Sequence, residues 1–245
     1  MFDLTGRTAL VTGAGQNVGA GIARALASQG ASVAVNDVRA ERAEETVSQI
    51  TAAGGNASVL AFDVTDFDAV AAGVAGFGAV DILVNNAGNG GAEQMGMTQF
   101  RESDPAQWHG PIDVNLYGVM NCCRAVINGM CDRGWGRVIT ISSGAGLQGL
   151  TIGVSPYAAG KGGGIGFMRH LAAECARSGV TANTVALGLM ALFDSGATAN
   201  LARAIPVGRV GTPDDVGAIC VYLASNEAEW MTGQTIRLDG GSTIT

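Results

Sequence analysis

The sequence predicts a single α/β domain in which a parallel sheet is covered by helices on both faces. Short apolar runs alternate with helical patterns along the whole chain, and this alternation is typical of successive βαβ units. A glycine-rich turn follows the first apolar run. Because no linker, repeat or low-complexity segment interrupts the alternation, residues 1–245 are expected to form one domain.

The composition indicates a globular protein with a large core. Of the 245 residues, 47% are hydrophobic and 14% are charged, and the chain has 38 glycines but 5 prolines. This balance favours close packing over disorder. The net charge of −7 argues against nucleic acid or an anionic membrane surface as a partner, because both attract basic patches.

Cysteine usage and apolar patterning indicate a cytoplasmic protein. The five cysteines show no metal-ligand spacing with each other or with the two histidines, so we expect reduced, mostly buried thiols and no bound metal. The first residues lack the pattern of a signal peptide, and no apolar run has the character of a membrane span.

The first predicted unit is a strand, a glycine turn and a helix. Residues 8–11 form the expected strand, which leads through TGAGQNVG into a helix beginning near Asn17. Gly13, Gly15 and Gly19 allow a sharp turn and a close approach of a ligand to the backbone, and the helix start directs its N–H groups at a phosphate. A glycine-rich turn alone is weak evidence, so its meaning depends on the strand that comes after the helix.

The second predicted strand, residues 31–36, ends in an acid. Asp37 lies 18 residues after Gly19, close to the spacing expected for an acid that binds the adenosine ribose hydroxyls of a dinucleotide. An acid there repels a 2′-phosphate, which favours NAD over NADP. Two alternatives stay open: Asp37 serves only to cap the helix predicted at 40–50, or Arg39 makes room for NADP.

Three further strands are predicted in the middle of the chain. Residues 59–62 form the third strand, followed by Asp63 and Val64 and a short helix at 66–77. A buried strand at 82–84 runs into a turn with Asn85, Asn86 and Gly88, and asparagine tolerates the unusual backbone angles expected at the carboxyl ends of parallel strands. A helix at 111–130 carries Asn115, and a strand at 137–142 leads to Ser143.

Tyr157 and Lys161 are the candidate catalytic pair. They are four residues apart in a helix predicted at 157–177, so they share a helix face. A free phenol has a pKa of about 10, and a nearby cation lowers that pKa and brings the group closer to acid–base work at neutral pH. Ser143 can hold a reacting oxygen. Taken alone, the pair also fits a chance placement on one helix.

The last third of the chain predicts a strand at 180–186, a helix that begins after Thr212 and ends near Ser225, and a final strand at 234–238. The Thr212-Pro213-Asp214-Asp215 sequence is typical of a helix start. Between them, residues 187–198 are rich in Leu, Met, Phe and Ala. This composition favours a lid over a nonpolar substrate, with an ordinary surface loop as the alternative.

In this order and spacing, the motifs resemble those of the short-chain dehydrogenase/reductases over nearly the whole chain. The matching pieces are TGAGQNVG, Asp37, DILVNNAG, VNLYG, the ISS at 141–143, YAAGK, VTANTVALG, GRVGTPDDV and TGQTIRLDGG. The resemblance implies a single doubly wound Rossmann domain with a seven-stranded parallel sheet. It also implies a homotetramer assembled through the helices that carry Asn115 and Tyr157.

The resemblance further implies a role for each catalytic position. Tyr157 would exchange a proton with the substrate oxygen, which Ser143 would orient. Lys161 would bind the nicotinamide ribose and lower the tyrosine pKa, and Asn115 would hold a water in the proton relay. The implied cofactor contacts are Gly13, Gln16, Asn17, Val18, Gly19, Asp37, Asp63, Val64, Asn86, Tyr157, Lys161 and Met190.

Four positions depart from the family pattern. Asn17 replaces a glycine, and because asparagine tolerates positive φ we expect a slightly shifted turn with retained binding. Leu187 replaces a proline, which loosens the start of the expected lid. Leu192 stands where a threonine often contacts the nicotinamide amide, and Gly160 stands where serine is common.

The leading functional hypothesis is an NAD-dependent oxidoreductase acting on a small molecule, a secondary alcohol or its ketone. Met95, Met97 and Leu192 are expected to rim an apolar pocket, which favours a cyclic, aromatic or terpenoid-like substrate. One alternative is a 3-oxoacyl carrier-protein or acyl-thioester reductase using NADPH, against which Asp37 and the acidic net charge argue. Another is a binding or scaffold protein that senses NAD without turnover, which would have the same fold and against which the complete set of Asn115, Ser143, Tyr157 and Lys161 argues.

Overall fold

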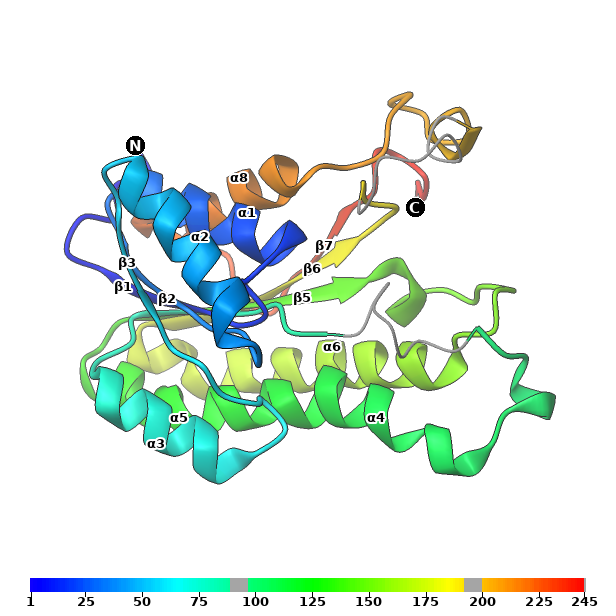
Figure 1. The fold of residues 1–245 in the computed structure, drawn as a ribbon, viewed down its shortest axis with the longest axis horizontal. Coiled ribbons are helices and arrows are strands. Elements are labelled where there is room, and N and C mark those ends of the chain that lie inside the picture. The colour runs from blue at the N-terminus through cyan, green and yellow to red at the C-terminus, as the bar shows by residue number, and fades with distance from the viewer. Residues whose placement is uncertain (89–96, 192–199, 245) are drawn as a thin grey trace.

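Seven parallel strands form one sheet in the computed structural model, which describes residues 1–88, 97–191 and 200–244. The strand order is β3-β2-β1-β4-β5-β6-β7. Helices α1, α2 and α8 cover one face of the sheet, and α3, α4, α5 and α6 cover the other (Figure 1). The predicted doubly wound Rossmann architecture with seven parallel strands is confirmed.

The element bounds agree with the predicted ranges at most positions. The strands are β1 (Thr8–Val11), β2 (Ser32–Val35), β3 (Asn56–Val59), β4 (Ile82–Asn85), β5 (Gly136–Ser143), β6 (Val180–Leu187) and β7 (Thr235–Leu238). The α-helices are α1 (Asn17–Ser28), α2 (Ala40–Ala52), α3 (Phe67–Phe77), α4 (His109–Ile112), α5 (Gly118–Asp132), α6 (Ser155–Cys175) and α8 (Pro213–Ala224). Short 3-10 turns cover Phe100–Glu102, Pro105–Gln107, Gly144–Gly146, Ala176–Ser178 and Asn226–Ala228.

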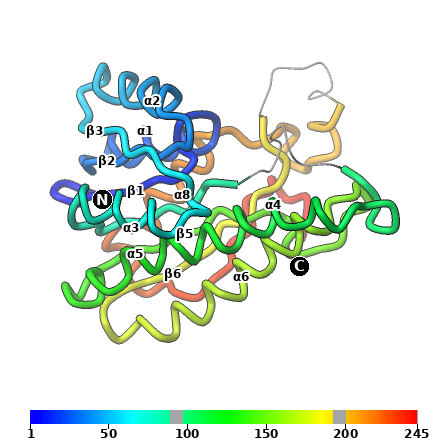
Figure 2. The backbone as a smooth tube through the Cα atoms, turned by 60° about the horizontal axis from the view of Figure 1, so that its bottom comes forward, coloured from blue at the N-terminus to red at the C-terminus, as the bar shows by residue number. Residues whose placement is uncertain are grey.

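The sheet is buried between two apolar layers. One hydrophobic cluster joins α1 and α8 to the sheet through residues such as Ile22, Leu26 and Val216. The other joins the opposite face to α3, α5 and α6 through residues such as Val70 and Met168, and these three helices lie side by side in Figure 2. Burial on both faces explains why the central strands are almost continuously apolar rather than alternating.

The third strand lies earlier than its predicted range of 59–62. Residues Asn56 to Val59 of β3 pair with Ser32 to Val35 of β2, and β2 ends at Val35. The apolar run after it leaves the sheet: the Asn36 side chain donates to the Leu60 and Phe62 carbonyls at 2.9 and 3.0 Å, and Phe62 packs into the core. The apolar residues after β3 therefore lead the chain from the sheet edge to the core, whereas β3 itself is largely exposed.

The helix predicted at 111–130 is divided by a π-helical segment. α4 passes into a π-helix at Asp113–Tyr117, which passes in turn into α5. Asn115 lies in the π-helical segment, and its Nδ2 donates to the Pro111 carbonyl at 2.8 Å. Such π segments occur often at functional sites, and no feature of the local sequence predicted this one.

Candidate active site

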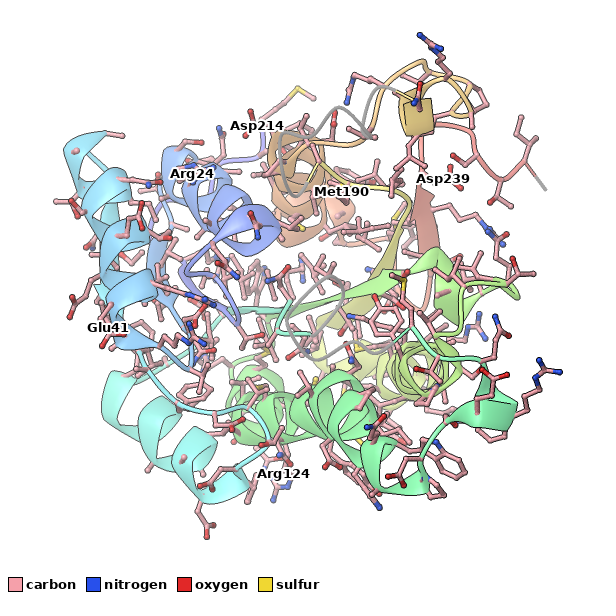
Figure 3. All side chains as sticks on the ribbon, turned by 45° about the vertical axis from the view of Figure 1, so that its right-hand side comes forward. Arg24, Glu41, Arg124, Met190, Asp214 and Asp239 are labelled. Carbon is pink, nitrogen blue, oxygen red and sulfur yellow. The ribbon has the colours of Figure 1, made fainter. Side chains whose placement is uncertain are left out.

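A cavity of about 690 Å³ opens at the carboxyl ends of the strands. Its walls come from the turn after β1, the end of β5, helix α6, the residues after β6 and the last residues of the chain. Met190 and Asp239, labelled in Figure 3, lie just beyond β6 and β7. This is the position at which doubly wound sheets bind their ligands.

The glycine turn forms one end of the cavity. Gly13 and Asn17 have φ of 59° and 49°, so Asn17 adopts the positive φ predicted for it. A Cβ on Gly19 would lie 2.2 Å from the Gly13 carbonyl oxygen, so only glycine fits there. The predicted cofactor residues that line the cavity are Gly13, Gln16, Asn17, Val18, Gly19, Asn86, Tyr157, Lys161 and Met190.

The first turn of α1 is suited to an anion. Gln16 is its N-cap and makes no side-chain capping bond, so the Gln16 side chain does not occupy the N–H groups that open the helix. Asn86 holds the turn in place, because its Nδ2 donates to the carbonyls of Thr12 and Gly13 at 3.0 and 2.9 Å. The residues present therefore fit the phosphates of a dinucleotide.

Asp37 is 6% exposed and bonds to the glycine turn. Its carboxylate accepts the Gly15 N–H at 3.3 Å and the Arg39 N–H at 3.0 Å. The N-cap of α2 is Arg39 rather than Asp37, so the capping alternative is wrong. Asp37 itself is not among the residues that line the cavity.

Arg42 lines the cavity and was not predicted. A Cβ on Gly15 would lie 2.5 Å from the Arg42 Cβ and 2.7 Å from Asp37 Oδ2, which places Arg42 beside the turn. Arg39, the cation considered from the sequence, is not among the lining residues. Arg42 is one helical turn before Thr46, whose hydroxyl donates to the buried Ala14 carbonyl at 3.0 Å. This packing of α2 against the glycine turn is a tertiary contact that no motif in the sequence marked.

Ser143, Tyr157 and Lys161 lie together in the middle of the cavity wall. Lys161 Nζ is 5.8 Å from the centre of the Tyr157 ring and donates to the Ile141 carbonyl at 2.8 Å. A Cβ on Gly88 would lie 2.7 Å from Asn115 Oδ1 and 3.1 Å from Lys161 Nζ. Position 88, in the turn after β4, must therefore be glycine so that the Asn115 and Lys161 side chains can approach it.

Burial shifts the pKa values of Tyr157 and Lys161 in opposite directions. It raises the pKa of the Tyr157 phenol, and the hydrogen bond with Ser143 lowers that pKa in part. It also lowers the pKa of Lys161 to about 8, since desolvation disfavours the charged form. The predicted lowering of the tyrosine pKa by Lys161 is not found, because burial has the largest effect on the phenol and raises its pKa.

Besides Asp37, three predicted site residues lie elsewhere than on the cavity wall. Asp63 is exposed and accepts the Thr65 N–H at 2.8 Å, Val64 is buried, and Asn115 is buried in its π-helical segment. None of the three is a lining residue. Their cofactor and relay roles stay predictions.

The apolar part of the wall differs from the predicted rim. Met97 is 69% exposed and does not line the cavity, while Met95 and Leu192 lie outside the described residues. The apolar lining comes from Leu150, Ile152, Val154, Leu189 and Met190. Sequence reasoning missed the first three, because the stretch after Ser143 has no strand or helix pattern from which its direction could be inferred.

Neither a metal-binding cluster nor a membrane-spanning helix occurs among the described residues. Within those ranges, no group of three His, Cys, Asp or Glu side chains is arranged to hold a metal ion. None of the helices in the described part of the chain has the length and apolar character needed to cross a bilayer.

The whole chain is similar to known oxidoreductases and related proteins. A family model described as Enoyl-(Acyl carrier protein) reductase matches residues 13–243. Nodulation protein G of Azospirillum brasilense is 40% identical over 96% of this chain and 97% of its own length. A 3-oxoacyl-[acyl-carrier protein] reductase from Brucella melitensis, solved with NAD, is 32% identical with a TM-score of 0.93, covering 100% of this chain and 94% of that one.

A second solved structure shares the fold at similar identity. The gluconate 5-dehydrogenase of Burkholderia cenocepacia, solved with NADP and tartrate, is 35% identical and has a TM-score of 0.89. The match covers 98% of this chain and 96% of that one. Similar chains thus hold either nicotinamide dinucleotide.

Proposed function

Because this chain belongs to the short-chain dehydrogenase/reductase family of oxidoreductases, we propose that it transfers hydride between NAD(H) and a secondary alcohol or ketone. One observation carries the proposal: Ser143, Tyr157 and Lys161 line the same cavity as the glycine turn. A dinucleotide held at the turn and a carbonyl held at Ser143 would share that cavity. The site supports this function more specifically than the fold does, since the fold alone serves many activities.

The nicotinamide, when bound, supplies or accepts the hydride. The phosphates would rest on the glycine turn and the start of α1, and Lys161 would bind the nicotinamide ribose. Tyr157 exchanges the proton: its phenol donates to the carbonyl oxygen in reduction, and its phenolate takes the alcohol proton in oxidation. Since burial raises the pKa of Tyr157, the neutral phenol prevails near pH 7, which is the form that reduction requires.

The apolar lining supports a substrate with an apolar body. Leu150, Ile152 and Val154 lie on one segment of the wall, and Leu189 and Met190 lie on another. Covering these side chains with a cyclic or aromatic group removes apolar surface from water, at about 25 cal/mol per Å². A small polyol would leave that surface unmatched.

A second candidate function is the NADPH-dependent reduction of a 3-oxoacyl thioester. Two observations favour it: the description of the matched family and the Brucella relative both name acyl-carrier-protein reductases, and Arg42 places a cation beside the turn where a 2′-phosphate would sit. The net charge of −7 disfavours docking of an acidic carrier.

The test is a fluorescence titration with NADH and with NADPH, followed by turnover of cyclic and aryl ketones and of acetoacetyl-CoA with the tighter cofactor. The proposal expects tight NADH binding and turnover of a bulky ketone. Preferential NADPH binding with turnover of acetoacetyl-CoA alone would establish the thioester reductase instead.

Tyr157→Phe separates catalysis from mere sensing of the cofactor. We expect turnover to fall by about 10²- to 10⁴-fold, the usual contribution of a positioned acid–base group, while the Kd for NADH changes less than about 3-fold. A protein that senses NAD without turnover would show no activity in either form and unchanged binding in both.

A further inference from the structure

We propose that Arg237 anchors a carboxylate of the substrate, so that the substrate of this cavity is an apolar keto acid or hydroxy acid. The inference rests on the proposed hydride transfer and names its substrate class. The distribution of charge around the cavity is the first observation that supports it.

The charged residues of the cavity wall are mostly cations, although the chain as a whole is acidic. Arg42, Lys161 and Arg237 line it with one carboxylate, that of Asp239, in a chain of net charge −7. A cavity lined mainly by one sign of charge concentrates ions of the opposite sign. The wall therefore favours anionic ligands.

Arg42 and Arg237 lie at opposite ends of the sheet and cannot serve the same anion. Arg42 packs beside Gly15, next to β1 and β2, whereas Arg237 lies on β7 at the other edge. Five strand spacings separate β2 from β7, which is about 24 Å at 4.8 Å each. A dinucleotide with its phosphates on the glycine turn would meet Arg42, leaving Arg237 for the substrate.

The register of the sheet places Arg237 on the same face as the catalytic helix. Ser142 pairs with Ala186, and Ala186 pairs with Arg237, so the three lie in one row on one face of the sheet. That face is the one covered by α6, because Ser142 Oγ bonds the Lys161 carbonyl at 3.3 Å. Arg237 is thus two strands, about 10 Å, from the strand that ends in Ser143.

The Arg237 guanidinium has no partner within the described ranges, where it makes neither an ion pair nor a hydrogen bond. By contrast, Arg209 holds Asp215 through two bonds of 2.6 and 2.8 Å. Asp239, the nearest carboxylate along the chain, instead accepts the Gly241 N–H at 3.0 Å. A half-buried guanidinium facing a cavity offers a planar fork that matches a carboxylate.

Ser242 and Thr243 also line the cavity that Arg237 lines. Thr243 Oγ1 donates to Gln148 Oε1 at 3.3 Å, which joins the last residues to the segment after Ser143. That same segment supplies Leu150 and Ile152 to the lining. An apolar body ending in one carboxylate fits this surface, whereas an acyl thioester brings no free carboxylate to Arg237.

The test compares ketones that differ only in charge. Wild type and Arg237→Met are assayed with levulinate and benzoylbutyrate and with the methyl ester of each. We expect Arg237→Met to lower kcat/KM for the acids by about 10- to 100-fold, as for the loss of a charge-assisted hydrogen bond, and to change kcat/KM for the esters by less than about 3-fold. Arg237→Lys should retain part of the preference for the acids.

Controls separate a loss of anchoring from a loss of fold. Arg24→Met removes a cation from α1, outside the cavity wall (Figure 3), and should leave both substrate classes unchanged. NADH titration and thermal melting of Arg237→Met should match wild type. An equal loss for acid and ester, or no loss for either, would overturn the role of Arg237.

A binding measurement keeps the two proposals distinguishable. If wild type transfers no hydride to any ketone, the proposed function fails, and the Kd for benzoylbutyrate is then measured by NMR in the presence of NAD. Weaker binding of the acid to Arg237→Met than to wild type would still support the anchor. Equal binding to both would refute it.

Discussion

At the scale of single residues, Asp37 and Arg42 act in opposite directions on the choice of cofactor. The carboxylate of Asp37 is held against the Gly15 N–H, and a negative charge there repels a 2′-phosphate. Arg42 lies against the same glycine and faces the cavity, where its positive charge attracts that phosphate. We therefore expect the preference between NAD and NADP to depend on both side chains rather than on Asp37 alone.

Arg42→Met measures how much this cation contributes to the binding of NADPH. We expect the Kd for NADPH to rise by about 10-fold and the Kd for NADH by less than about 3-fold, because only NADPH carries the additional phosphate. Fluorescence titration at low salt gives both constants, and Arg39→Met is the matched control. If Arg39→Met weakens NADPH binding and Arg42→Met does not, the assignment of the two arginines is reversed.

The candidate catalytic pair, Tyr157 and Lys161, shows how burial changes a prediction based on spacing. The four-residue interval put Tyr157 and Lys161 on one helix face, and both line the cavity. The direction of the tyrosine pKa shift could not be obtained from spacing, because it depends on how much of the phenol is desolvated. Lys161, only 7% exposed, has its own pKa lowered by the same cause.

At the scale of elements, the glycine turn depends on the close contact of α1 with α8. A Cβ on Gly21 would lie 2.4 Å from the Pro213 Cβ and 3.0 Å from the Pro213 backbone. A second glycine, Gly217, faces α1 from α8, where a Cβ would lie 2.7 Å from the Ala25 Cβ. The two helices approach through these positions, and α1 carries the turn at its first residues.

Gly21→Ala tests this contact, with Gly76→Ala as its matched control. We expect Gly21→Ala to lower the free energy of unfolding by about 1–3 kcal/mol, because the added methyl group overpacks the interface. Gly76 lies in α3 with nothing within 4 Å of its Cβ position, so alanine there should raise stability by up to about 1 kcal/mol. Urea denaturation measures both; equal stabilisation by both changes would show that α1 can shift freely.

Element boundaries were predictable where local chemistry sets them. The start of α8 has the capping box formed by Thr212 and Asp215, as the residue types indicated. The start of α1 was likewise found at Asn17. β3 was misplaced because its position depends on pairing with β2, and the π-helical segment at Asp113–Tyr117 was missed because it depends on surrounding packing.

At the scale of the whole molecule, the homotetramer is still a prediction. The side chain of Tyr117, at the end of the π-helical segment, is 53% exposed, and that of Met120 on α5 is 38% exposed. Both belong to the helix that the family resemblance assigns to assembly. Large apolar side chains exposed on one helix mark a candidate contact surface.

Light scattering on the purified protein tests the assembly. We expect a mass of about 99 kDa, four times the chain mass of 24.7 kDa, and a shift to smaller species when Tyr117 and Met120 are both changed to Glu, because buried charges in an apolar interface are costly. Arg24→Glu, away from α5, should leave the mass unchanged. A wild-type mass of one chain would contradict the prediction.

The sequence by itself determined the alternating α/β order, the glycine turn, the placement of Tyr157 and Lys161 on one helix face, and the start of α8. Each of these depends on residues close together in the chain, whose spacing already fixes how they meet. Only the tertiary structure decided that Arg42 and Arg237 occupy opposite ends of one cavity, and that burial raises the pKa of Tyr157. These properties depend on strand order and packing density, which bring distant segments together and remove them from water.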